Sequence, residues 1–150
     1  ILDKPYNFLT QPFAAKMVIL LGLLWRWTGY NMVFFLSGLQ NIEYSVYEAA
    51  KIDGASAIQT FFKITVPLLK PTILLTAIMS TNGTLQLFDE SVNLTDGGPA
   101  NASISMSHYI YNLCFKYVPN FGYAAAMSFF ILLLVAVLAF IQMRVGDKRD

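Results

Sequence analysis

The sequence has few charged residues, a single cysteine and a single histidine. Charged residues make up 13% of its 150 residues and hydrophobic residues 56%, which argues against a soluble domain and favours a bilayer as the solvent. Cys114 has no partner for an intrachain disulfide, and His108 has no second ligand at metal-binding spacing, so we expect no metal site. The 10 basic residues are scattered among 9 acidic ones, which excludes nucleic acid as a partner.

Catalytic motifs are also missing from the sequence. It contains no G-x4-G-K-[ST] phosphate loop, no G-x-S-x-G elbow, no H-E-x-x-H and no paired acids in a credible pocket, so we expect no enzymatic activity. The chain begins at Ile1 without a basic n-region and cleavage site. We therefore expect no signal peptide and expect that upstream sequence is missing.

Apolar segments of membrane length stand at residues 13–39, 71–88 and 123–143. They predict an all-α membrane protein with three spans. The first would run roughly 40 Å as a helix, longer than a bilayer core of about 30 Å, so a tilted or protruding helix is expected. It carries Arg26 between two tryptophans, with a helix break near Gly29 as one possibility. An unpaired charge here is costly, so Arg26 either lines a path or pairs with a carboxylate or carbonyl of a neighbouring helix, which we favour.

Hydroxyl side chains recur every four residues in the segment 71–88. On a helix they form one stripe, with Gly83 alongside to permit a close approach. The stripe either lines a path for a polar solute or only bonds its own backbone and a packed neighbour. Asn82 and Gln86 lie on another face, where hydrogen bonds between helices are the simpler account. The members of the stripe are Thr72, Thr76, Ser80 and Thr84.

The segment 40–70 is too polar to span a membrane and predicts two short helices. Glu43 to Ile52 is rich in helix formers and is followed by Gly54, which can close a helix in the left-handed conformation. Ser56 and Gln59 have the spacing of a capping box at the start of a second helix, which Pro67 should end. The segment 89–121 contains a Gly-Gly-Pro turn and a possible short interfacial helix.

The distribution of basic residues predicts the topology. With three spans, the loop 40–70 and the C-terminus lie on one side, whereas the loop 89–121 has only Lys116 against three acids. By the positive-inside rule, the loop 40–70 and the C-terminus should face the cytoplasm of a multi-pass protein. The basic residues on that side are Lys51, Lys63, Lys70, Arg144, Lys148 and Arg149.

The loop 40–70 resembles the EAA loop of type I ABC importer permeases. The flanks Phe35–Gln40, Leu87–Asp89, Leu94–Pro99 and Gly122–Ala126 are similar to carbohydrate importers of the maltose, lactose and raffinose type, so the resemblance covers about residues 12–145. Glu43 departs from it, because such proteins commonly have proline there. The residues that match the EAA motif are Glu48, Ala49, Ala50, Asp53, Gly54, Ala55, Phe61, Ile64, Pro67 and Pro71.

The resemblance implies the fold, the partners and the coupling residues. Residues 1–150 would be the C-terminal portion of one permease domain in a bacterial cell membrane, with the first two or three spans absent. A second permease subunit would complete the solute path, and an extracytoplasmic sugar-binding protein would deliver the sugar. Cytoplasmic ATPase subunits, which hold ATP and Mg²⁺, would receive the EAA residues in a surface cleft. This chain itself would carry no cofactor.

For solute contact we predict Tyr30, Ser80 and Thr84, then Thr76, with Asn82 and Gln86 behind. Hydroxyls and aromatic faces suit a neutral sugar, because they exchange hydrogen bonds and stack without desolvating a charge. One alternative is the same architecture for glycerol phosphate or an oligosaccharide acid, for which Arg26 is the only cationic candidate in the path. The other is a membrane anchor or assembly subunit that transports nothing.

Overall fold

The computed structural model describes residues 8–146, and this part of the chain contains helices and no strand. Two helices, α1 (Pro12–Gln40) and α7 (Phe121–Gly146), are long and apolar enough to cross a membrane. A third candidate is the bent pair Ala57–Leu68 and Lys70–Leu85, if it is counted as one span. The prediction of an all-α membrane protein is confirmed, while the assignment of spans to 13–39, 71–88 and 123–143 stays a prediction.

Helix α1 is continuous over its 29 residues. Pro12 stands in its first turn, where the missing N–H has no helical partner to lose. A short 3₁₀ turn, η1 (Phe8–Thr10), precedes it. The break near Gly29 that the sequence allowed is wrong, because the helix runs through this residue to Gln40. A single glycine lowers helix propensity by only about 1 kcal/mol, which the long apolar helix tolerates.

The EAA loop, residues 40–70, folds as predicted into α2 (Tyr44–Ile52) followed by a second helical stretch. Gly54 has φ of +74° and turns the chain, and the capping box of Ser56 and Gln59 starts α3 (Ala57–Thr60). The chain continues as a π-helical turn, η2 (Phe61–Thr65), and then as α4 (Val66–Leu68).

This stretch ends at Leu68, one residue after Pro67, so the predicted end of the second helix is confirmed to within one residue. The axis then bends at Leu69. The bend between the stretch Ala57–Leu68 and α5 (Lys70–Leu85) is 64°. The expected helix over residues 71–88 is shorter than predicted, since Leu87 and Phe88 are not helical.

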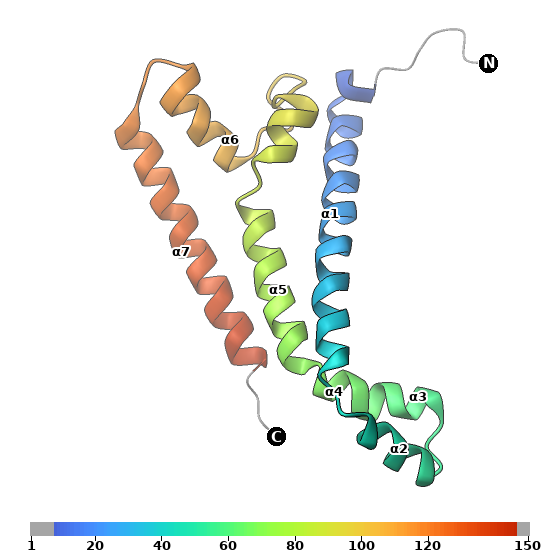
Figure 1. The fold of residues 1–150 in the computed structure, drawn as a ribbon. Helices are drawn as coiled ribbons and strands as arrows, with labels where there is room; N and C mark the ends of the chain where they lie inside the picture. Colours follow the sequence, from blue (N-terminus) through green and yellow to red (C-terminus); the bar gives the residue numbers. More distant parts are fainter. Residues whose placement is uncertain (1–7, 147–150) are drawn as a thin grey trace, which may run out of the picture.

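Helix α5 lies between α1 and α7 (Figure 1). A Cβ atom on Gly83 would stand 2.6 Å from Cη2 of Trp27, so the predicted close approach at this glycine is confirmed, with α1 as the partner. On the other side, Nε2 of Gln142 in α7 donates a hydrogen bond of 2.8 Å to Oγ1 of Thr81. Helix α5 therefore joins the two long helices.

The helices α2, α3 and α4 lie at one end of the molecule, and the segment between α5 and α7 lies at the opposite end (Figure 1). That segment contains a π-helical turn, η3 (Ser91–Thr95), and then α6 (Met106–Tyr111) with a further turn, η4 (Asn112–Lys116). The predicted short helix is therefore present. The last residues of α7 return to the α2–α4 end.

Candidate functional site

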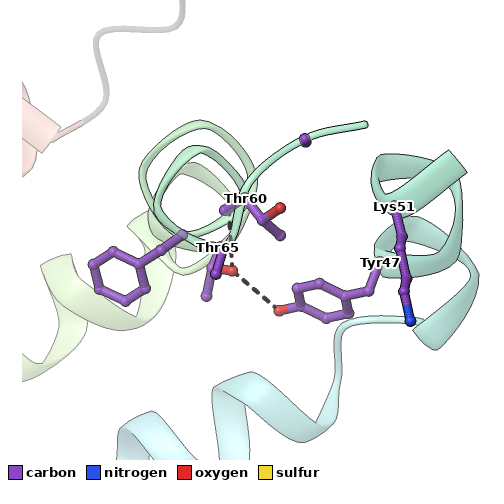
Figure 2. A pocket seen from close by; sticks show the side chains of 7 residues that line it. Tyr47, Lys51, Thr60 and Thr65 are labelled. Carbon is purple, nitrogen blue, oxygen red and sulfur yellow. Dashed lines mark hydrogen bonds between the residues drawn. The ribbon is translucent and has the colours of Figure 1, made fainter. Parts of the chain in front are cut away.

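A pocket of about 480 Å³ opens between α2 and the helical stretch that follows Gly54. Tyr47 and Lys51 project from α2 on one side, and Thr60 and Thr65 lie on the other (Figure 2). The hydroxyl groups of Tyr47 and Thr65 form a hydrogen bond of 3.3 Å, which ties α2 to η2. The residues that line the pocket are Tyr47, Lys51, Ala55, Ala57, Thr60, Phe61 and Thr65.

Two of the predicted coupling residues, Ala55 and Phe61, line this pocket. Ala50 is buried and Ile64 half-buried. The others are exposed at the surface of the same loop: Glu48, Ala49, Asp53, Gly54 and Pro67. Most of the motif residues therefore lie at the surface of the loop, and only Ala55 and Phe61 face the pocket.

Large apolar side chains of the loop are exposed around the pocket. Ile58 is 72% exposed, and Phe61 and Phe62 are 50% and 65% exposed with their rings edge to face at 5.0 Å. Apolar surface of this kind on a polar loop is typical of sites that contact a partner protein or a membrane surface.

Sequence reasoning missed Tyr47, Lys51, Thr60 and Thr65 as pocket residues. The four-residue spacing of Tyr47 and Lys51 places them on one helix face and was a usable signal. The position of Thr65 depends on the π-helical turn η2, which no local sequence pattern predicts.

Three members of the hydroxyl stripe contact either α1 or the backbone of their own helix, α5. Oγ1 of Thr76, which is buried, donates to the carbonyl oxygen of Thr72 at 2.9 Å in its own helix. Oγ of Ser80 donates to Oδ1 of Asn31 in α1 at 3.3 Å. A Cβ atom on Gly38 of α1 would stand 2.8 Å from Oγ1 of Thr72. These contacts support the packing interpretation for this part of the stripe.

The remaining predicted contact residues are exposed but do not share one pocket. Tyr30 lies in an apolar groove along α1, whereas Gln86 lines a separate pocket of about 460 Å³ with Ser107 and Ser128. Thr84 is exposed as well.

The expected hydrogen bonds of Asn82 and Gln86 to another helix are wrong. Nε2 of Gln86 donates to Oδ1 of Asn82 at 2.7 Å within one exposed surface. Residues four apart are neighbours on a helix, so the two side chains are close enough to form a hydrogen bond with each other.

Arg26 pairs with carboxylates that follow α5. Its Nη1 atom lies 2.9 Å from Oε1 of Glu90 and 3.8 Å from Oδ2 of Asp89, and its guanidinium stands 5.7 Å from the ring centroid of Trp27. Glu90 is buried. The interpretation of Arg26 as a paired arginine is therefore confirmed.

The long apolar helices α1 and α7 define a multi-helix membrane protein, and the loop between α1 and α5 carries an exposed pocket. The chain belongs to the family of binding-protein-dependent transport system inner membrane components, which matches residues 7–149. Among its relatives is the lactose transport system permease protein LacF of Rhizobium radiobacter, which is 54% identical over 99% of this chain and 51% of the relative.

Other comparisons agree with this family. The arabinooligosaccharides transport system permease protein AraP of Bacillus subtilis is 33% identical over 97% of this chain and 46% of its own length. A crystal structure of a bacterial ABC transporter involved in the import of alginate shares the fold, with a TM-score of 0.80 and 24% identity over 95% of this chain and 50% of that one. The chain thus spans about half the length of these proteins.

Proposed function

We propose that this chain is part of a membrane permease for sugar uptake, and that its EAA loop couples the permease to ATP hydrolysis on separate ATPase subunits. The observation that carries the coupling role is the pocket between α2 and η2, with exposed Phe61 at its wall. The sugar assignment is supported by relatives named for lactose and arabinooligosaccharide transport. The further partners are a second permease subunit and an extracytoplasmic sugar-binding protein.

Coupling is tested with Phe61→Ala and with Phe115→Ala as a matched control. Phe61 is 50% exposed, so a partner can bury about half a phenylalanine side chain, worth about 1 kcal/mol. We expect about fivefold weaker binding of the ATPase subunits to the permease and a corresponding loss of uptake. Phe115 is 72% exposed and belongs to η4, at the opposite end of the molecule. The Phe115→Ala permease should therefore bind the ATPase subunits normally. Equal effects of both substitutions would contradict the coupling role.

Gly54→Pro is a second test of coupling. Proline fixes φ near −65°, which is incompatible with the φ of +74° at this turn, so the angle between α2 and α3 must change. We expect the variant to reach the membrane and to lose transport. Normal uptake by this variant would contradict the coupling role of the loop.

The orientation is tested by labelling single cysteines in a Cys114→Ser background. Ser45 is exposed in α2 and Val118, 88% exposed, lies at the opposite end. If the EAA loop is cytoplasmic, an impermeant maleimide labels Ser45→Cys only in inverted vesicles and Val118→Cys only in intact cells. The reverse pattern would overturn the topology.

Solute contact by Tyr30 and Thr84 is tested by removing one hydroxyl at a time. Tyr30 is 60% exposed, and we expect Tyr30→Phe and Thr84→Val to raise the KM of sugar uptake while the amount of permease stays unchanged. Tyr44→Phe removes a similarly exposed hydroxyl from the EAA loop and serves as the control. An unchanged KM in both Tyr30→Phe and Thr84→Val would contradict solute contact by these two residues.

The two alternatives make different predictions. A path for an anionic solute would need a free cation, and Arg26 is already paired with Glu90 at 2.9 Å. A membrane anchor would co-purify with neither an ATPase nor a second permease, whereas a permease subunit brings down both. Identifying the ligand of the associated binding protein would name the sugar.

A further inference from the structure

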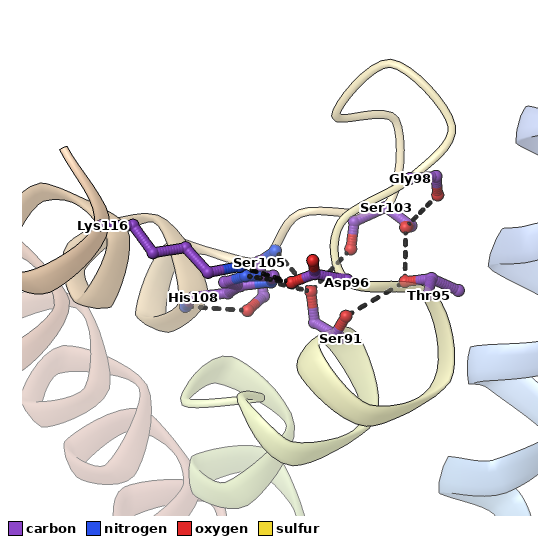
Figure 3. A network of polar contacts seen from close by, with 8 residues as sticks. All are labelled: Ser91, Thr95, Asp96, Gly98, Ser103, Ser105, His108 and Lys116. Carbon is purple, nitrogen blue, oxygen red and sulfur yellow. Dashed lines mark hydrogen bonds and ion pairs between the residues drawn. The ribbon is translucent and has the colours of Figure 1, made fainter.

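A polar cluster with a buried centre and an exposed ion pair joins η3 and the loop after it to α6 and η4 at the end opposite the EAA loop (Figure 3). Ser91 and His108 are both fully buried at its centre. Asp96 follows η3 with a φ of 45°, and Lys116 ends η4. We call Ser91, Asp96, His108 and Lys116 the clasp. It lies apart from the EAA pocket and from the predicted solute-contact residues.

The hydrogen bonds of Ser91 favour one tautomer of His108. Oγ of Ser91 lies 2.9 Å from the carbonyl oxygen of Ser103, and we assign its only proton to this carbonyl, which has no proton of its own to offer. Toward Nδ1 of His108, at 2.9 Å, this oxygen can therefore only accept, and it also accepts from the backbone N–H of Ser105 at 3.2 Å. The neutral ring thus carries its proton on Nδ1. Because the Ser91 hydroxyl is saturated and buried, this Ser-His-Asp arrangement has no free nucleophile.

This tautomer leaves a lone pair on Nε2 of His108. Among the residues that the structure describes, this buried atom has no hydrogen-bond partner, and it lies 3.6 Å from Oδ1 of Asp96. The same Oδ1 accepts a hydrogen bond of 2.7 Å from Nζ of Lys116. A lone pair aimed at a carboxylate is repulsive, whereas a proton on Nε2 would make the contact attractive.

Only Asp96 and Lys116 contribute charge near His108 among the described residues. Glu90, beside Ser91, turns to Arg26 instead, and the contacts of the ring with Phe88 and Gly97 are uncharged. Burial lowers the pKa of His108, the Asp96 carboxylate raises it, and the Lys116 ammonium lowers it. The hydrogen bond from Lys116 in turn lowers the pKa of Asp96. His108 is therefore neutral at pH 7.5 while Asp96 is ionised.

We propose that the clasp is a proton-dependent switch in which protonation of His108 on Nε2 transfers Asp96 from Lys116 to His108. The buried imidazolium needs a counter-charge, and the nearest carboxylate oxygen is only a few tenths of an ångström beyond hydrogen-bond distance. The transfer releases Lys116, which ends η4 just before the chain enters α7. Acid on this side of the membrane thus loosens the contact between η4 and the loop after η3.

The experiment uses the whole permease with ¹⁵N-labelled histidine, and the His108 signals are assigned by their loss in His108→Asn. The asparagine amide retains a donor for Ser91, so we expect this variant to fold. At pH 7.5 we expect the Nδ1–H tautomer, and on acidification a titration midpoint below about 6.5. An Nε2–H tautomer at pH 7.5 would overturn the proposal.

Two substitutions of exposed side chains test the exchange of partners. Lys116→Met should raise the midpoint, because it removes a cation and frees Asp96. Asp96→Asn should lower it by about one pH unit or more, because the counter-charge is lost. Lys51→Met, at the opposite end, is the control and should leave the midpoint unchanged. If neither Lys116→Met nor Asp96→Asn changes the titration midpoint of His108, the proposal is overturned.

The movement of Asp96 has its own signal. With ¹³C-labelled aspartate, assigned by Asp96→Asn, the carboxyl resonance of Asp96 should shift at the same midpoint as the His108 ring. A carboxyl signal that stays constant while the ring titrates would show that Asp96 keeps Lys116 and would refute the switch. None of these readouts depends on transport, so a failure here is distinct from a failure of the proposed function.

Discussion

Removal of Arg26 should destabilise the protein by leaving a buried carboxylate without its partner. The Glu90 side chain is 10% exposed, and its Oε1 atom lies 2.9 Å from the guanidinium, while Oε2 is buried and finds no hydrogen-bond partner within residues 8–146. Breaking a buried ion pair on one side costs about 3 to 5 kcal/mol. Because the Arg26 side chain is 34% exposed, we expect the lower value, about 3 kcal/mol for Arg26→Leu.

A double-mutant cycle separates the pair from the individual side chains. Glu90→Leu should cost less than Arg26→Leu, since the guanidinium keeps Asp89 at 3.8 Å and its partial access to solvent. The double variant should recover about 1 to 3 kcal/mol relative to the sum of the single ones. Asp89→Asn, at a carboxylate that is 71% exposed, is the control and should change stability by less than about 0.5 kcal/mol.

The assay is equilibrium unfolding in mixed detergent micelles, followed by tryptophan fluorescence. Trp25 and Trp27 flank Arg26, so their emission reports the region of interest. If Arg26→Leu unfolds at the same denaturant concentration as the wild type, or if the single effects simply add, the pair does not stabilise the helices. Arg26 would then be free for a role in the solute path.

Three further predictions concern local contacts. Gly83→Leu drives a side chain into Trp27 and should separate α1 from α5, which lowers the unfolding temperature, whereas Gly29→Leu, with open space at its Cβ, should not. Ser56→Ala removes the oxygen that accepts the 3.3 Å hydrogen bond from the Gln59 backbone and should cost about 1 kcal/mol, seen as faster proteolysis of the EAA loop. Because burial lowers the pKa of His108, the folded protein binds fewer protons than the unfolded chain, and stability should fall as the pH drops through about 6.5. Thermal unfolding at pH 7.5 and 5.5 checks this, and His108→Asn should abolish the difference.

The features that the sequence predicts well are those that neighbouring residues decide. The turn at Gly54 and the capping box of Ser56 and Gln59 involve residues at most three apart, and both are present. The long apolar helices α1 and α7 follow from composition alone. The close approach at Gly83 was predictable because only a glycine lacks the Cβ that would obstruct it, although its partner Trp27 was not.

The features that the sequence could not predict depend on distant partners or on competition between local preferences. Glu90 stands far from Arg26 along the chain, and no periodic pattern relates the two. The sequence predicts the end of the helix near Pro67, but the 64° bend that follows at Leu69 depends on how α5 packs between α1 and α7. The buried pair of Ser91 and His108 likewise arises from the folding of the loop after η3 back onto α6.

The position of α5 gives the proposed coupling a mechanical basis. The wall of the EAA pocket, η2, continues through α4 to Leu69, which is 7% exposed and whose N–H donates to the Thr65 carbonyl oxygen at 3.0 Å. Only Leu69 stands between α4 and α5, and α5 is hydrogen-bonded to α1 through Ser80 and to α7 through Thr81. A partner that displaces η2 must therefore either move α5 with both long helices or break the buried bend. Because opening the bend would expose Leu69 and break its hydrogen bond to Thr65, we expect the displacement to pass into α5.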